Sequence, residues 1–105
     1  MEVSVDIESA GERIVEEHLR RRSFATSIDL RKSGSTIIKA VGSVRKYLVE
    51  VRTAVSPDTP APLSQLEVEK ITVDAMRIGY EAWDARVRVD PSGNLLGNII
   101  WIRLG

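Results

Sequence analysis

Residues 47–52, Tyr-Leu-Val-Glu-Val-Arg, combine an apolar strand pattern with one acid and one base two positions apart. Side chains of a strand alternate between its two faces, so Glu50 and Arg52 share one face. Val49 and Val51 point to the opposite face. Both valines need an apolar layer beneath them, and we expect a helix to supply it. A sheet with at least one helix packed on it is therefore the fold that this segment favours.

The polar face of the same strand is open to two interpretations. A glutamate and an arginine side by side are typical of the edge of a metal-dependent nuclease site. They are equally typical of a solvated strand face, on which Glu50 and Arg52 would pair with Lys39 and Asp29 of neighbouring strands.

Turn residues and helix signals divide the rest of the chain into elements. Ser9 and Ser64 each stand three residues before a glutamate, which is the spacing of a capping box. Alternating apolar residues predict strands, and three prolines within residues 55–62 predict a loop. We expect helices over residues 10–22 and from Ser64 to Gly79, and strands over residues 23–30, 36–41, 46–54, 80–89 and 95–104.

This order predicts one α/β domain over residues 1–105: a helix, a three-stranded meander, a second helix and a two-strand hairpin, with a single mixed sheet flanked by helices. Residues 1–8 are expected to be a loose extension. The 105 residues, 43% of them hydrophobic, suit one domain and no more.

Composition excludes several classes of function. Lysine plus arginine and aspartate plus glutamate number 15 each, so the chain as a whole has no positive field for binding nucleic acid. The sequence lacks cysteine and has one histidine, His18, which makes zinc unexpected. We expect His18 to be partly buried and structural. The sequence also lacks a phosphate-binding glycine loop, an apolar run of membrane-spanning length and a secretory leader, and we expect a cytoplasmic protein without membrane contact.

The order of elements and four motif positions resemble the PD-(D/E)XK nuclease-like superfamily. The resemblance rests on Gly11 and Glu12 in the first helix, the strand ending Val-Glu-Val-Arg at Arg52, the proline-rich loop, the capped helix and the closing hairpin. Within the superfamily, the chain is most similar to the small members related to Holliday-junction resolvases and to the UPF0102 proteins. The resemblance implies a restriction-endonuclease-like fold.

The same resemblance implies a magnesium-dependent endonuclease site. Glu50 corresponds to the central acid of the motif, Glu12 to a helical glutamate found in some members, and Arg52 stands where lysine is usual. The aspartate of the second strand is missing from residues 36–39, and Asp29 is the nearest substitute. The implied catalytic residues are Glu50, Arg52, Glu12 and Asp29, with Glu50 and Asp29 as metal ligands, and the missing acid indicates an eroded site.

DNA is the partner that this resemblance implies. Arg31, Lys32, Arg45 and Lys46 lie at turns of the expected meander, and we expect them to join Arg52 in a phosphate-binding patch.

An inactive accessory or protein-interaction subunit on the same fold is the alternative function. Residues 95–104 are apolar on both faces, so this strand is expected to be covered by the helices or by a second copy of the chain, through Ile99 or Trp101.

Overall fold

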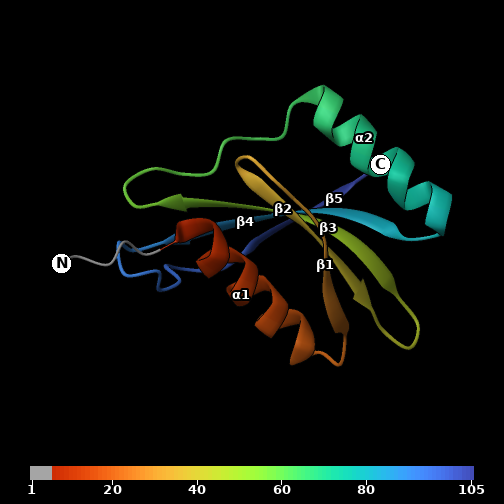
Figure 1. The fold of residues 1–105 in the computed structure, drawn as a ribbon, viewed down its shortest axis with the longest axis horizontal. Coiled ribbons are helices and arrows are strands. Elements are labelled where there is room, and N and C mark those ends of the chain that lie inside the picture. The colour runs from red at the N-terminus through yellow and green to blue at the C-terminus, as the bar shows by residue number, and fades with distance from the viewer. Residues whose placement is uncertain (1–5) are drawn as a thin grey trace.

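The computed structural model describes residues 6–105 and contains two helices and five strands (Figure 1). The elements are α1 (Ile7–Arg20), β1 (Ala25–Lys32), β2 (Ser35–Val41), β3 (Lys46–Val55), α2 (Gln65–Ile78), β4 (Glu81–Val89) and β5 (Ile100–Leu104). The predicted order of helix, meander, helix and hairpin is confirmed.

The five strands form one mixed sheet in the order β1-β2-β3-β4-β5. Strands β1, β2 and β3 pair antiparallel through short turns. The connection through α2 then returns the chain to the same end of the sheet, so β4 runs parallel to β3, and β5 pairs antiparallel with β4. The parallel register places Glu50 of β3 opposite Asp84 of β4.

Each face of the sheet is covered by one helix (Figure 1). Val15 and Leu19 of α1 pack on one face, in a core that contains Val49 and Val51. Helix α2 packs on the other face through Ile71 and Ala75, against Ile37, Leu48 and Ala82. Because side chains alternate along β3, Glu50 and Arg52 lie on the α2 face, as expected from the pattern of residues 47–52.

The two helix starts show one wrong and one correct capping prediction. Helix α2 begins after a complete capping box, in which the Ser64 hydroxyl accepts from the Glu67 amide and the Glu67 carboxylate accepts from the Ser64 amide. Helix α1 instead begins three residues earlier than expected. Its N-cap is Asp6, whose carboxylate accepts from the amide and the hydroxyl of Ser9. Ile7 and Glu8 therefore belong to the helix, and residues 1–5 of the expected extension lie outside the described part.

Two strand boundaries also differ from the expectation. Strand β1 lies two residues later than predicted, at Ala25–Lys32, because the turn is confined to Ser33 and Gly34. The last strand is confined to Ile100–Leu104, and only an isolated bridge between Val89 and Leu95 precedes it. Strand β5 lies at the edge of the sheet. In the described residues, neither helix is long and apolar enough to cross a membrane.

Candidate active site

Glu50 is fully buried on the α2 face, and its surroundings are polar. The Ser35 hydroxyl donates to Oε2 of Glu50 at 2.9 Å, and Nζ of Lys32 lies 3.1 Å from the same oxygen. The interpretation of this face as solvated, with Glu50 paired to Lys39, is therefore wrong for Glu50. The ammonium group beside Glu50 belongs to Lys32, the last residue of β1. Lys32 pairs with Ser35 across the first hairpin, so both side chains lie on the same face of the sheet as Glu50.

Asp84 is a second buried carboxylate beside Glu50. It is 1% exposed, and Nε of Arg86 donates to its Oδ2 at 2.9 Å. Burial raises the pKa of the Asp84 carboxyl, although the hydrogen bond from Arg86 and the charges of Arg86 and Arg52 oppose that rise.

Asp84 is not among the site residues expected from the sequence. The alternation of side chains along β4 predicts which face of the sheet Asp84 occupies. That Asp84 lies beside Glu50 follows only from the parallel pairing of β3 and β4.

Arg52 and Glu67 extend the site to the first turn of α2. Arg52 lies 3.8 Å from Glu67 and donates to the carbonyl oxygen of Ala61 at 2.7 Å, which ties the proline-containing loop to β3. Glu67 is also 4.0 Å from Lys32. The acid–base cluster that results comprises Glu50, Glu67, Asp84, Lys32, Arg52 and Arg86. Its three acids balance its three bases.

Two carboxylate oxygens of the cluster lack a hydrogen-bond donor in the described part of the chain. Oε1 of Glu50 and Oδ1 of Asp84 are buried, and neither has a hydrogen-bond partner within residues 6–105. Magnesium is a hard cation that is commonly held by one or two carboxylates together with water and phosphate oxygens. The donor set on the α2 face therefore fits magnesium.

The acid missing from the second strand has a clear structural position. Ile37 of β2 is the cross-strand partner of Glu50 and belongs to the core on the α2 face. A carboxylate at residue 37 would stand next to Glu50. With an apolar side chain in this position, β3 and β4 are the strands that supply carboxylates to the cluster, and Glu67 is added from α2.

Glu12 lies on the other side of the sheet from Glu50. Its carboxylate accepts from the Thr36 hydroxyl at 2.6 Å and from the guanidinium of Arg31. Thr36 pairs with Val51, whose side chain is part of the core beneath α1. Because the sheet separates Glu12 from Glu50, the structure does not bring them together, contrary to expectation.

Asp29 does not approach Glu50 either. The register between β1 and β2 shifts between Ile28 and Leu30, so Asp29 is the extra residue of a bulge, and it is exposed. In the described part of the chain no three histidine or acidic side chains are arranged to hold a metal ion. The expected pairing of Glu50 with Asp29 as metal ligands thus has no geometric support, and the acid that stands beside Glu50 is Asp84.

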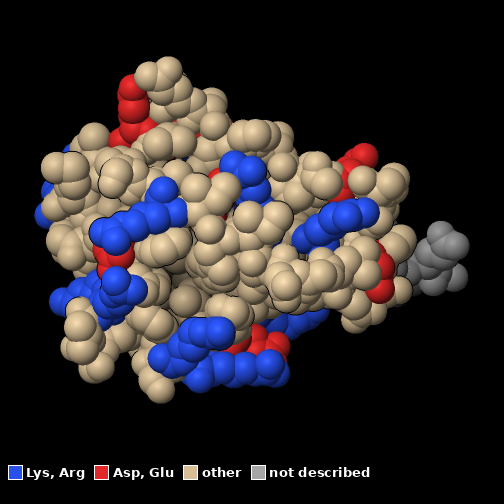
Figure 2. All heavy atoms as spheres, turned by 180° about the vertical axis from the view of Figure 1, so that it is seen from behind, with Lys and Arg blue, Asp and Glu red and all other residues tan. Residues whose placement is uncertain are grey.

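The four basic residues expected to form a phosphate patch are dispersed. Arg31 and Lys32 end β1, just before its turn to β2, whereas Arg45 and Lys46 lie where the second turn leads into β3. Successive turns of a meander lie at opposite ends of the sheet (Figure 1). Arg31 is paired with Glu12 and Lys32 with Glu50. Figure 2 likewise shows basic side chains in separate groups on one face of the molecule, several of them touching acidic ones.

Comparisons with known proteins identify the fold. No protein-family model and no curated protein sequence matches this chain. Among solved structures it is similar to Hjc from Archaeoglobus fulgidus, a Holliday junction resolvase from an archaeal hyperthermophile, with a TM-score of 0.68 and 22% sequence identity. The match covers 91% of this chain and 71% of the resolvase chain. The protein thus has the fold of the PD-(D/E)XK nucleases, as the sequence pattern indicated.

Proposed function

We propose that this protein processes nucleic acid by metal-dependent cleavage of phosphodiester bonds, at the acid–base cluster on the α2 face. The observation that carries the proposal is the pair of buried carboxylates, Glu50 and Asp84, each with one oxygen free of hydrogen bonds from residues 6–105. An unpaired buried carboxylate oxygen is costly, and a bound cation offsets that cost. The likeness to a Holliday junction resolvase favours DNA as the substrate.

Glu50 and Asp84 would hold the metal, with magnesium as the expected ion. When bound, the metal polarises a phosphate oxygen and lowers the pKa of a water molecule. Lys32 already contacts Glu50 and would neutralise charge on the phosphate. The planar guanidinium of Arg52 can bind phosphate through two N–H groups, so its role is to position substrate.

Binding of nucleic acid without cleavage is the second candidate function, and two observations favour it. Ile37 occupies the position beside Glu50 where a third carboxylate would complete the site. In addition, Lys32 and Arg86 already pair with Glu50 and Asp84, which reduces the affinity of the two acids for a metal ion.

Calorimetric titration and cleavage assays with the same variants separate these candidates. Magnesium and manganese are titrated into the metal-free protein. A labelled four-way DNA junction, duplex DNA and single-stranded DNA are tested for binding to the protein and, with each metal, for cleavage. We expect metal binding and cleavage to be lost in both Glu50→Gln and Asp84→Asn. Glu69→Gln, which removes an exposed acid of α2, is the matched control and should leave both unchanged.

Three other outcomes are informative. Binding of DNA without metal binding or cleavage supports the second candidate. Cleavage that survives Asp84→Asn assigns the site to residues other than the Glu50–Asp84 pair. Failure to bind DNA or a metal at all contradicts both candidates.

A further inference from the structure

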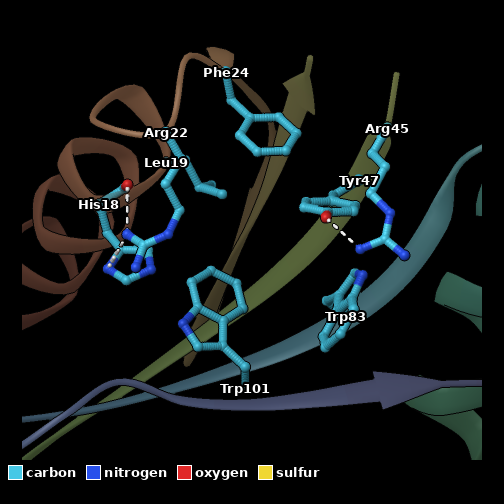
Figure 3. Close-up of a pocket in the computed structure, with 8 residues that line it drawn as sticks. All are labelled: His18, Leu19, Arg22, Phe24, Arg45, Tyr47, Trp83 and Trp101. Carbon is cyan, nitrogen blue, oxygen red and sulfur yellow. Dashed lines mark hydrogen bonds between the residues drawn. The ribbon is translucent and has the colours of Figure 1, made fainter. Parts of the chain in front are cut away.

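An aromatic pocket lies on the opposite face of the sheet from the acid–base cluster. It is enclosed by the last turn of α1 together with β3, β4 and β5, and has a volume of about 200 Å³ (Figure 3). Four aromatic side chains and two arginines form most of its wall: Phe24, Tyr47, Trp83, Trp101, Arg22 and Arg45. Trp83 precedes Asp84 on β4, so the sheet separates the pocket from the carboxylate pair.

The aromatic rings stand at angles to one another around an open space. Trp101 lies 6.4 Å from Trp83 in an edge-to-face arrangement, and Tyr47 lies 4.8 Å from Phe24 between ring centres. Figure 3 shows Trp101 between the His18 side of the pocket and the Tyr47 side. Such walls offer flat apolar faces on which another planar ring can stack.

The charged groups at the rim are cationic. Arg22 donates to the carbonyl oxygen of His18 and is 3.3 Å from its Nδ1. Burial, followed by the charges of Arg22 and Arg21, lowers the pKa of His18, so the imidazole is neutral at pH 7. Arg45 is 3.5 Å from the Tyr47 hydroxyl and 3.7 Å from Glu81, which offsets part of its charge.

One wall of the pocket also carries an unsatisfied donor. The indole Nε1 of Trp83 is buried and has no acceptor in the described part of the chain. A buried donor without an acceptor is uncommon and destabilising.

We propose that this pocket binds a nucleotide, with the base among the aromatic rings and a phosphate at the rim, where Arg22 and Arg45 lie on opposite sides (Figure 3). Aromatic cages also bind quaternary ammonium groups, but two arginines at the rim repel a cation and attract an anion. The volume lies below the roughly 300–1,000 Å³ of pockets for drug-sized ligands, which limits the occupant to about one ring system. A free mononucleotide and one base of a single strand present the same chemistry.

Intrinsic fluorescence measures occupancy directly, because the only two tryptophans of the chain both line the pocket. The full chain is titrated with thymidine monophosphate and with an eight-residue oligothymidine in buffer containing EDTA. Stacking of a base should quench the emission, and chelation removes any metal-dependent contribution of Glu50 and Asp84. Quenching by both probes identifies a nucleotide site, whereas quenching by the oligonucleotide alone identifies a site for a strand.

Variants test whether the signal belongs to this pocket. Replacing both Arg22 and Arg45 by glutamine should weaken binding at least tenfold, and Phe24→Leu should weaken it while its melting temperature verifies folding. Arg77→Gln, which removes an exposed arginine of α2 outside the pocket, should bind as the wild type does.

The proposal is overturned if neither probe quenches, or if quenching persists in the double arginine variant. It is also overturned if N-acetylphenylalaninamide displaces or replaces the nucleotide, since the pocket would then be a site for an aromatic side chain of a protein. Its failure leaves the proposed function intact, because the carboxylate pair lies on the other face and is tested with metals and cleavage.

Discussion

Ile37 lies directly across the β2–β3 ladder from Glu50, and both side chains face α2. This pairing defines where the second-strand acid of a three-carboxylate site would stand. The missing acid does not disturb the fold, because Ile37 in its place packs against Leu48 and Ile71 in the core beneath α2.

Ile37→Asp should create a stronger metal site at a cost in stability. Without metal, the variant loses the packing of a buried isoleucine and gains a carboxylate beside Glu50, and we expect it to be less stable by about 3 kcal/mol or more. With magnesium or manganese, the three carboxylates can share one ion, and we expect affinity to rise at least tenfold. Thermal unfolding with and without metal measures both effects.

Ile37→Asn is the matched control for that experiment. It loses the same packing but adds no charge, so metal should restore little of its stability. Equal rescue of the asparagine and aspartate variants would show that residue 37 does not reach the ion.

The raised pKa of Asp84 predicts an unusual pH dependence for one variant. Because burial raises this pKa above its ordinary value of 3.8, the folded state holds the proton to higher pH than the unfolded state does. The stabilising contribution of the protonated carboxyl is present at low pH and is lost as pH rises through the folded pKa.

Asp84→Asn abolishes this titration. We therefore expect the stability of Asp84→Asn relative to wild type to increase as pH rises from 3.8 through the folded pKa, in urea unfolding measured at successive pH values. The free energy of unfolding of the variant must be compared with that of the wild type at each pH. Glu67, whose pKa is lowered by its capping hydrogen bond, makes both proteins more stable as pH rises, and this contribution cancels in the difference. A difference that is flat or decreases with pH would contradict the assignment.

The pair formed by Lys32 and Glu50 should show strong energetic coupling. Lys32→Met leaves the charge of Glu50 buried with Ser35 as its remaining partner within the described cluster, and we expect a loss of about 2–3 kcal/mol. Adding Glu50→Gln to the Lys32→Met variant should recover part of the lost stability, because the buried charge is removed. A double-mutant cycle by urea unfolding should give a coupling of about 1 kcal/mol or more. Lys70→Met, on the exposed side of α2, should have little effect.

The sequence predicted the order of elements because each of its signals is local. Alternation placed Val49 and Val51 on one face and Glu50 and Arg52 on the other, and the capping box at Ser64 marked the start of α2. The start of α1 was missed because Asp6 and Ser9 offer competing caps. Only the geometry of the backbone decides between two such caps.

The site was less predictable because its residues meet through pairing between distant segments. Glu50 and Asp84 are brought together by the parallel register of β3 and β4, which no local pattern encodes. Glu12 was assigned to the wrong face of the sheet because the family resemblance fixes element order but not the direction of a helical side chain. Arg31 has a simpler explanation: it is held by Glu12 on that same face.

Close packing of α1 on β3 makes Gly11 sensitive to substitution. A Cβ at Gly11 would overlap Oγ1 of Thr53 and lie 2.9 Å from its Cβ. Alanine favours a helix over glycine by about 1 kcal/mol, but overpacking costs about 1–3 kcal/mol, so we expect Gly11→Ala to be destabilising on balance. Chemical unfolding checks this. In a Thr53→Ala background the loss should shrink, because the hydroxyl is absent while the Cβ remains. An unchanged loss would place the clash elsewhere.

The free edge of β5 predicts self-association. Ile100 is 57% exposed on this edge strand, and Leu95 and Leu96 before it are each 38% exposed. Ile99 and Trp101 are instead partly buried against the core beneath α1, which leaves Ile100 as the outward apolar side chain of the strand. An unprotected edge with an exposed isoleucine is a surface on which another strand can pair. We therefore expect a homodimer formed through β5.

Light scattering on a sizing column should give about twice the monomer mass of 11.7 kDa for the wild type. Ile100→Lys should shift the protein to a monomer, because a charged side chain on an edge strand opposes pairing. Val44→Lys is the matched control: Val44 is 91% exposed at the turn between β2 and β3, far along the chain from β5, and its replacement should leave the dimer intact. A wild-type protein that remains monomeric over a wide concentration range would contradict the expectation, and loss of the dimer in both variants would assign the interface to another surface.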